Sequence, residues 1–309
     1  NFFATRFTPG WGGLTFISNE SQSIYHGFNA QLKKNFTHNY TFTANYTFGK
    51  VLDNLTEGGL GDYFNVNGYG LLYSGLSDVH NQRNDRAPSE FDVRHRFTLS
   101  ALIGLPGPKE GVLHTVFGGW QISSIITLQS GRPFDVYCGL GWFLGCDFNM
   151  DGLSYDRPNR PANLKTSGFS NSQLANGIFG DPSLTFYGAT FESRTSVASQ
   201  TFCPNGLNSI IDFGPVLSGP GSQCVTVGTN GKLGRNVFRG PAFKQVDFSL
   251  LKTFPIYERL NLQFHFDAFN LFNRVNLYNP VGDLGSPQFG QSAAAFSPRL
   301  LQLGLKFVF

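Results

Sequence analysis

A short acidic motif carries the metal-binding chemistry that the sequence suggests first. Its members are Asp147, Asn149, Asp151 and Gly152, which spell D-x-N-x-D-G. This spacing places three oxygen side chains around a tight glycine turn, as in calcium-binding loops. The twelfth position of such a loop should hold a bidentate Glu, but it holds Pro158 here, so Asp156 would have to substitute. The motif therefore indicates either a calcium site or a plain Asx turn, and no other cofactor is expected.

All four cysteines fall in one long stretch between predicted strands. They are Cys138, Cys146, Cys203 and Cys224. An even number of cysteines in an exported chain favours two disulfides, and the sequence allows three pairings. We expect the pairing that joins Cys138 to Cys146 and Cys203 to Cys224, with free surface thiols as the alternative. No C-x-x-C spacing supports a zinc site.

A histidine and a carboxylate two residues apart suggest acid–base chemistry. His265 and Asp267 would share one face of an extended strand, where they could transfer protons in a barrel lumen. A polar lumen wall explains them equally well, and the chain lacks the G-x-S-x-G, H-E-x-x-H and G-x-x-x-x-G-K-[ST] motifs. We therefore do not expect an enzyme, and an outer-membrane hydrolase that uses His265 is the least favoured alternative.

Other polar residues on or near predicted strands are candidates for contact with a solute. Four arginines could attract an anionic solute or could bond to a plug and to neighbouring strands; they are Arg83, Arg86, Arg94 and Arg96. The predicted ligand-facing or lumen-facing residues are Arg94, Arg96, Asn261, Gln263, His265 and Asp267.

The elements that would position these residues are strands of alternating polarity. In the last eleven residues, RLLQLGLKFVF, the Leu and Phe residues at 301, 303, 305, 307 and 309 fall on one side, and Gln302, Gly304 and Lys306 fall on the other. Strand side chains alternate with period 2, and the stretch is about as long as a tilted strand that crosses a bilayer. Six more segments alternate in the same way: residues 23–34, 39–48, 94–103, 112–129, 244–254 and 259–271.

The connections between these segments alternate between short and long. In chain order they cover residues 35–38, 49–93, 105–111, 130–243, 255–258 and 273–298. An outer-membrane barrel has short periplasmic turns and long extracellular loops, whereas a sandwich has no reason to keep this order. We therefore predict an all-β, antiparallel, up-and-down transmembrane β-barrel in the bacterial outer membrane. Its large extracellular loop region is 130–243, and its carboxyl terminus is periplasmic.

Composition agrees with a barrel and excludes other classes. Charged residues make up 14% of the chain and aromatic residues 15%, with 33 Phe and 37 Gly, which suits strands and turns rather than long helices. A net charge of +3 without a basic run argues against a nucleic-acid partner. No apolar run is long enough for a transmembrane helix, and the opening NFFATRFTPG is not a signal peptide, so we expect a fragment of a longer protein.

The number of predicted strands also favours a fragment. Seven alternating segments cannot complete a single-chain bacterial barrel, because such barrels have an even number of strands. Residues 2–8 could supply an eighth strand and close a minimal barrel, but two loops would then be oversized for it. We favour a larger barrel, of which residues 1–309 form one fragment.

Five segments resemble, in the right order, the carboxyl-terminal barrel of Oar-like TonB-dependent outer-membrane receptors. They are SIYHGFNAQLKKNFTHNYTFTANYTFGKVLDN, NDRAPSEFDVRHRFTLSALIGLP, GGWQISSIITLQSGRPFDV, DFNMDGLSYDRPNRP, and the ending from FDAFNLFNRVN to LQLGLKFVF. The resemblance implies a plugged barrel of about 22 strands that imports a scarce or large solute of the siderophore, oligosaccharide or peptide class. The plug and amino-terminal domains of such receptors are absent from these 309 residues.

The resemblance also implies partners. Outer-membrane lipid would surround the wall, and the TonB complex would deliver energy through the plug. The barrel assembly machinery would recognise the terminal strand with its aromatic end, Phe309.

A secreted all-β adhesion or carbohydrate-binding protein is the main alternative. Exposed tryptophans would then stack on sugars, and the apolar strand faces would be buried against a second sheet. A barrel would instead turn Phe264, Phe266 and Leu303 outward. The exposure of these side chains therefore distinguishes the two architectures.

Overall fold

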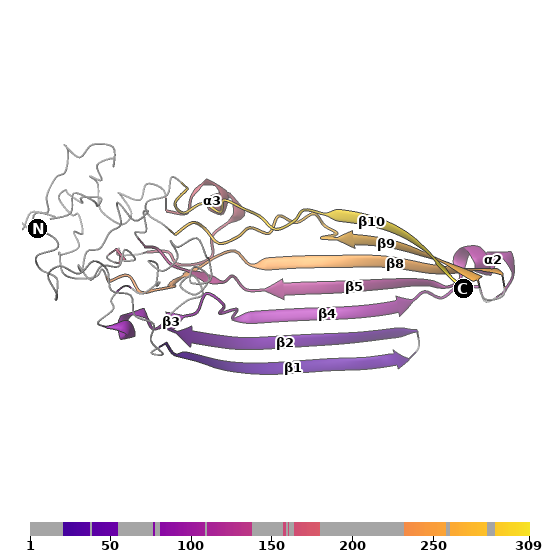
Figure 1. Ribbon diagram of the computed structural model, residues 1–309, viewed down its shortest axis with the longest axis horizontal. Coiled ribbons are helices and arrows are strands. Elements are labelled where there is room, and N and C mark those ends of the chain that lie inside the picture. The colour runs from indigo at the N-terminus through magenta and orange to yellow at the C-terminus, as the bar shows by residue number, and fades with distance from the viewer. Residues whose placement is uncertain are drawn as a thin grey trace, which may run out of the picture.

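The computed structural model describes residues 21–37, 39–54, 77, 81–108, 110–137, 157–158, 160, 164–179, 232–257, 260–282 and 288–309. These residues form a broad antiparallel sheet with a smaller packed region at one end of its strands (Figure 1). Within the described ranges, none of the helices has the length and hydrophobicity needed to cross a membrane.

Seven long strands build the sheet, and each is hydrogen-bonded to the next along the chain. They are β1 (Ser23–Thr37), β2 (Tyr40–Asp53), β4 (His95–Gly104), β5 (Trp120–Gln129), β8 (Phe243–Tyr257), β9 (Leu260–Phe269) and β10 (Leu300–Val308). Every pairing is antiparallel, and the two-residue strand β3 (Ala87–Pro88) pairs with the last two residues of β2. The predicted antiparallel, up-and-down arrangement of strands is confirmed.

One predicted strand is wrong in its first half. The alternation predicts a strand over 112–129, but the structure has helix α2 (Gly111–Phe117) followed by β5. The reason is that Leu113, Val116 and Phe117 are also spaced as i, i+3 and i+4, which fits one side of a helix. Gly119, with φ of +69°, then turns the chain into β5. The predicted short connection at 105–111 is therefore longer and contains a helix.

The register gives the sheet one apolar face, because cross-strand partners share a face. A single row of partners crosses six strands and contains Tyr40, Ile103, Ile122, Leu250, Phe266 and Leu303. Leu303 is 72% exposed, and Phe264 and Phe266 are half-buried. Among the described residues no second sheet covers this face, so the arrangement that a sandwich requires is not found.

The two edges of the sheet run in the same direction. β1 pairs with β2 and β10 with β9, and within the described residues neither has a partner on its other side. Consecutive strands alternate in direction, so the first and the seventh are parallel. Joining these two edges directly would create a parallel pair; an antiparallel wall would need an odd number of further strands between them.

The buried core lies beyond the long strands, at the end where the long connections are attached (Figure 1). Here β6 (Pro133–Phe134) pairs with β7 (Phe238–Arg239), and α3 (Asn171–Asn176) begins at Ser170, whose hydroxyl accepts from the Gln173 backbone N–H at 3.2 Å. Most of the buried apolar side chains are in this region: Phe134, Val136, Leu174, Phe179, Leu233, Phe238 and Phe289. We call β6, β7, α3 and the residues packed on them the loop-end cluster.

Candidate functional site

The polar face of the sheet is the first candidate site, and it carries most of the predicted lumen residues. Arg96 lies opposite Thr47 on β2 and Gln129 on β5. On β9 the four remaining candidates alternate with the apolar row; they are Asn261, Gln263, His265 and Asp267. The structure thus brings five of the six candidates onto one face, while contact with a solute stays a prediction.

His265 and Asp267 occupy neighbouring positions of this face without acting on each other. His265 lies opposite Leu251 and Gly304, and Asp267 lies opposite Ser249 and Gln302. Within the described residues no hydrogen bond joins the imidazole to the carboxylate. The arrangement suits a hydrated wall.

Amide and hydroxyl side chains bond across the strands of the polar face. The Gln31 side-chain amide donates to Asn45 Oδ1 at 2.7 Å, and the Thr47 hydroxyl donates to Asn29 Oδ1 at 2.8 Å. Within β8, Asp247 accepts from the Gln245 side-chain amide at 2.8 Å. The amides and hydroxyls present both donors and acceptors to water or to a polar solute, and the Asp247 carboxylate adds acceptors.

Arg94, the sixth predicted lumen residue, stands just before β4 at the end of the sheet that carries the loop-end cluster. Its guanidinium lies 4.0 Å from a carboxylate oxygen of Asp92, which is fully buried and is paired more closely with Arg239. The structure therefore places Arg94 beside an ion pair rather than along the exposed polar wall.

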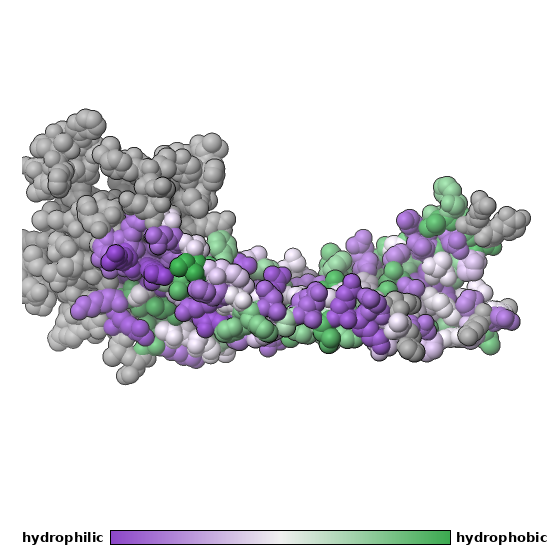
Figure 2. Space-filling view, turned by 90° about the horizontal axis from the view of Figure 1, so that it is seen from below, coloured by the Kyte–Doolittle hydropathy of each residue, from purple (hydrophilic) through white to green (hydrophobic). Residues whose placement is uncertain are grey.

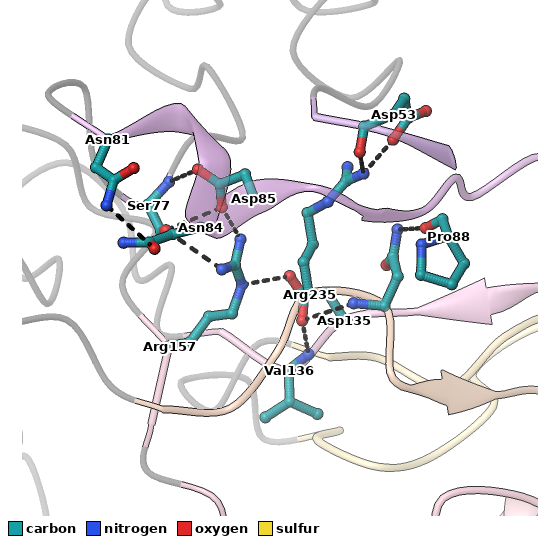
Figure 3. A network of polar contacts seen from close by, with 11 residues as sticks. Asp53, Ser77, Asn81, Asn84, Asp85, Pro88, Asp135, Val136, Arg157 and Arg235 are labelled. Atoms are coloured by element: carbon teal, nitrogen blue, oxygen red, sulfur yellow. Dashed lines mark hydrogen bonds and ion pairs between the residues drawn. The ribbon is translucent and has the colours of Figure 1, made fainter. Parts of the chain in front are cut away.

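A buried ionic network in the loop-end cluster is the second candidate site (Figure 3). Arg157 bonds to Asp85 and, through Nε, to Asp135 at 3.0 Å; it also donates to the Ser77 hydroxyl at 3.2 Å. Asp85 belongs to the 3₁₀ helix η3 (Gln82–Asp85) and also accepts from the Ser77 backbone N–H at 3.0 Å. One guanidinium thus joins three chain segments that are far apart in the sequence.

Burial controls the protonation of this network. It raises the pKa of the Asp135 carboxyl, and the charge of Arg157 with the backbone N–H donors of Asn236 and Val136 offsets only part of that increase. Burial also lowers the pKa of the Arg157 guanidinium, but the carboxylates of Asp135 and Asp85 more than compensate and raise it overall. Arg157 therefore remains a fixed positive charge between two acidic groups.

Two more arginine–aspartate pairs attach the cluster to the sheet. Arg235 bonds to the side chain of Asp53, at the end of β2, and to its backbone carbonyl at 2.9 Å. Arg239 bonds to Asp92, whose carboxylate also accepts from the Val51 backbone N–H at 2.8 Å. These contacts attach the cluster to the strand ends.

Sequence reasoning missed Arg157, Arg235 and Arg239. Their partners lie 72, 182 and 147 residues away along the chain. No local sequence pattern predicts a pairing over such sequence separations. The sequence offers one weak signal of their role: Arg157 stands beside Pro158 and Arg235 beside Gly234 in predicted loops. An arginine in a loop often bonds to backbone and carboxylate groups. That signal identifies candidates but not partners.

The predicted calcium ligands and cysteines lie outside the described residues. This applies to Asp147, Asn149, Asp151, Asp156 and to Cys138, Cys146, Cys203 and Cys224. The last two positions of the twelve-residue motif, Arg157 and Pro158, are described and buried in the loop-end cluster. Among the described residues no group of three or more His, Cys, Asp or Glu side chains is placed to hold a metal ion.

Comparison with known families identifies one match. A family model described as an outer membrane beta barrel domain matches residues 2–302. No curated protein and no solved structure matches the chain.

Proposed function

The chain belongs to the family of outer membrane beta barrel domains, and on that premise we propose that it forms part of the wall of an Oar-like, TonB-dependent receptor. Its location is the bacterial outer membrane. The receptor would bind a scarce or large solute, of the siderophore, oligosaccharide or peptide class, and import it through a gated lumen.

The observation that carries this proposal is the parallel direction of the two sheet edges. Every backbone N–H and C=O in hydrocarbon must be paired, so the wall has to close. β1 and β10 cannot pair with each other in an antiparallel barrel, and closure requires further strands in an odd number. A wide, plugged barrel satisfies this requirement and leaves room for a solute path.

The two faces of the sheet support the orientation that a receptor needs. The apolar row through Leu250, Phe266 and Leu303 would meet lipid, and the polar face with Arg96, Gln263 and His265 would meet the plug or solute. The long connections and the loop-end cluster would lie outside the cell, where a barrel captures its solute.

The loop-end cluster has the stiffness that capture requires. The pairs Arg235–Asp53 and Arg239–Asp92 hold it on the strand ends, and Arg157 joins its loops internally, so a binding surface there would lose little conformational entropy when solute arrives. The TonB complex would act through the plug, and the barrel assembly machinery would recognise β10.

Binding to TonB tests the proposal directly. The full-length protein that contains this chain, purified in detergent, should bind the immobilised periplasmic domain of TonB with a dissociation constant on the order of micromolar. Scrambling the TonB-box segment of the plug is the matched control and should abolish binding. Equal signals from the two forms, or no signal from either, would contradict TonB coupling.

A further inference from the structure

Helix α2 carries an apolar side that is open to its surroundings. Leu113 is 61% exposed, Val116 50% and Phe117 61%, and their i, i+3, i+4 spacing puts them on one side of the helix. Figure 2 shows hydrophobic side chains projecting from the end of the molecule at which Figure 1 places α2. Exposing these three apolar side chains of a seven-residue helix to water would be energetically unfavourable.

Contacts at the carboxyl end of α2 fix it on the apolar side of the sheet. The Val116 carbonyl accepts from the Trp120 indole N–H at 3.0 Å and from the Lys252 ammonium at 3.2 Å, and the Gly118 carbonyl also accepts from Lys252. Trp120 and Lys252 are cross-strand partners in the apolar half of the register. α2 is therefore continuous with the apolar face, which is the face that meets lipid in an outer-membrane barrel.

Lys252 explains how so short a helix can persist there. A helix of this length leaves its last carbonyls without intrahelical partners, and the Lys252 ammonium, on a side chain that is 2% exposed, satisfies two carbonyls at that end. Its charge also opposes the negative end of the helix dipole. The lysine thus ties α2 to β8.

Amphipathic side chains mark this end of the apolar face as a membrane–water boundary. The Lys34 ammonium lies 3.8 Å from the ring centroid of Tyr40, and the Lys252 ammonium lies 5.2 Å from that of Trp120. Tyr and Trp rings accompanied by lysine ammonium groups are typical of the depth at which hydrocarbon gives way to headgroups. The connections at this end are the short ones, which are periplasmic in outer-membrane barrels.

We propose that α2 is an interfacial anchor in the periplasmic leaflet of the outer membrane, with Leu113, Val116 and Phe117 inserted among phospholipid acyl chains. The continuity of α2 with the lipid-facing row favours lipid over a protein partner. His114, which lies between Leu113 and Thr115, is bonded through its ring to the Pro108 carbonyl at 2.7 Å. This inference rests on family membership and does not depend on TonB coupling.

Photo-cross-linking from two positions of α2 tests the anchor. The full-length protein would carry benzoylphenylalanine in place of Phe117, or in place of the exposed Thr115 as the matched control, and would be irradiated in its outer membrane. Mass spectrometry should find a phospholipid adduct at least about five times more often at position 117 than at 115, as expected for a helix with one side in lipid. Cross-links from position 117 to another protein, or equal lipid yields at both positions, would overturn the proposal.

A second measurement needs no substitution in α2, so it holds even if the labelled proteins fail to fold. Trp120 fluorescence, obtained as the difference between the native protein and Trp120→Phe, would be recorded in vesicles of brominated phosphatidylcholine. Quenching should be strongest when bromine sits on the carbons nearest the headgroup. Quenching that is strongest from the chain ends, or none from any lipid, would contradict an interfacial position.

Discussion

The long strands and the loop-end cluster are built for different surroundings. Along the strands, large apolar side chains such as Leu303 and Leu305 are exposed, and order comes from the antiparallel backbone pairing. In the cluster, Phe238 and Leu174 are fully buried and arginines such as Arg157 are paired with carboxylates. The cluster therefore resembles the interior of a soluble protein, while the strands require an apolar solvent on one side.

This difference predicts that the two regions respond to opposite kinds of substitution. A lost buried ion should damage the cluster and leave the sheet intact, because the strands do not depend on it for backbone pairing. A charge placed on the apolar face should damage the sheet and leave the cluster intact. Four predictions test this separation.

Removing the guanidinium of Arg157 should have the largest effect. Arg157→Met leaves the fully buried carboxylate of Asp85 and the largely buried one of Asp135 without their shared partner, which should lower the local free energy of unfolding by about 3–5 kcal/mol. Hydrogen exchange at the Val136 and Leu174 amides measures this loss. Arg160→Met, at an exposed position, is the control; equal exchange in the two variants would show that the network does not hold the cluster.

A charge on the apolar face should have the next largest effect. Leu303→Arg in β10 should lower the free energy of unfolding in phospholipid vesicles by about 2–4 kcal/mol if the side chain lies near the middle of the bilayer. Gln302→Arg, one residue away on the polar face, should change it little. Urea titration followed by tryptophan fluorescence gives both values, and a larger loss from Gln302→Arg would reverse the assignment of the faces.

The Lys252 ammonium is predicted to stabilise one helix rather than the whole sheet. Lys252→Met removes charged hydrogen bonds to the Val116 and Gly118 carbonyls and should cost α2 about 1.5–3 kcal/mol. Amide exchange in α2 should accelerate while exchange in β8 stays slow. Lys306→Met, at an exposed position on the polar face, should leave amide exchange in both α2 and β8 unchanged. Unaltered exchange in α2 of Lys252→Met would show that the lysine does not stabilise the helix.

The smallest predicted effect is a pH dependence confined to the cluster. Unfolded Asp135 titrates near its ordinary value of 3.8, and burial moves the folded pKa above that value. Between the two pKa values the folded state holds a proton that the unfolded state has lost, so local stability falls as pH rises through this window and levels off above it. In Asp135→Asn this contribution disappears. Hydrogen exchange of the cluster, recorded against pH for both proteins, measures the difference in local stability. If the native protein gained local stability relative to Asp135→Asn as pH rises, the raised pKa would be contradicted.

The strands could be predicted from the sequence because period-2 alternation is a local signal. In β10 and β9, apolar and polar residues alternate so regularly that the sequence predicts the face on which each residue lies, and the pairing of the two strands agrees with it. The same signal gave a wrong prediction at α2, where a strand was expected, because the spacing of Leu113, Val116 and Phe117 fits a helix as well as an interrupted strand. There, two consecutive glycines, Gly118 and Gly119, separate the helix from β5.

The loop-end cluster could not be predicted, because its contacts have no period. Arg235 reaches Asp53 across 182 residues, and Arg157 reaches Asp85 across 72. Long, glycine-rich connections at 49–93 and 130–243 indicate loops but not which loops meet. The pairing is decided by burial: each arginine is stable only where a carboxylate is desolvated beside it.

A scan of β10 with spin labels tests most directly whether the sheet separates lipid from water. After the four native cysteines are changed to serine, single cysteines at residues 301–307 would be labelled in vesicles, and their accessibility to oxygen and to a water-soluble nickel complex compared by electron paramagnetic resonance. Positions 301, 303, 305 and 307 should favour oxygen, and positions 302, 304 and 306 should favour nickel, because alternate side chains face opposite solvents. Equal accessibility along the strand, or the opposite phase, would contradict an apolar face in lipid.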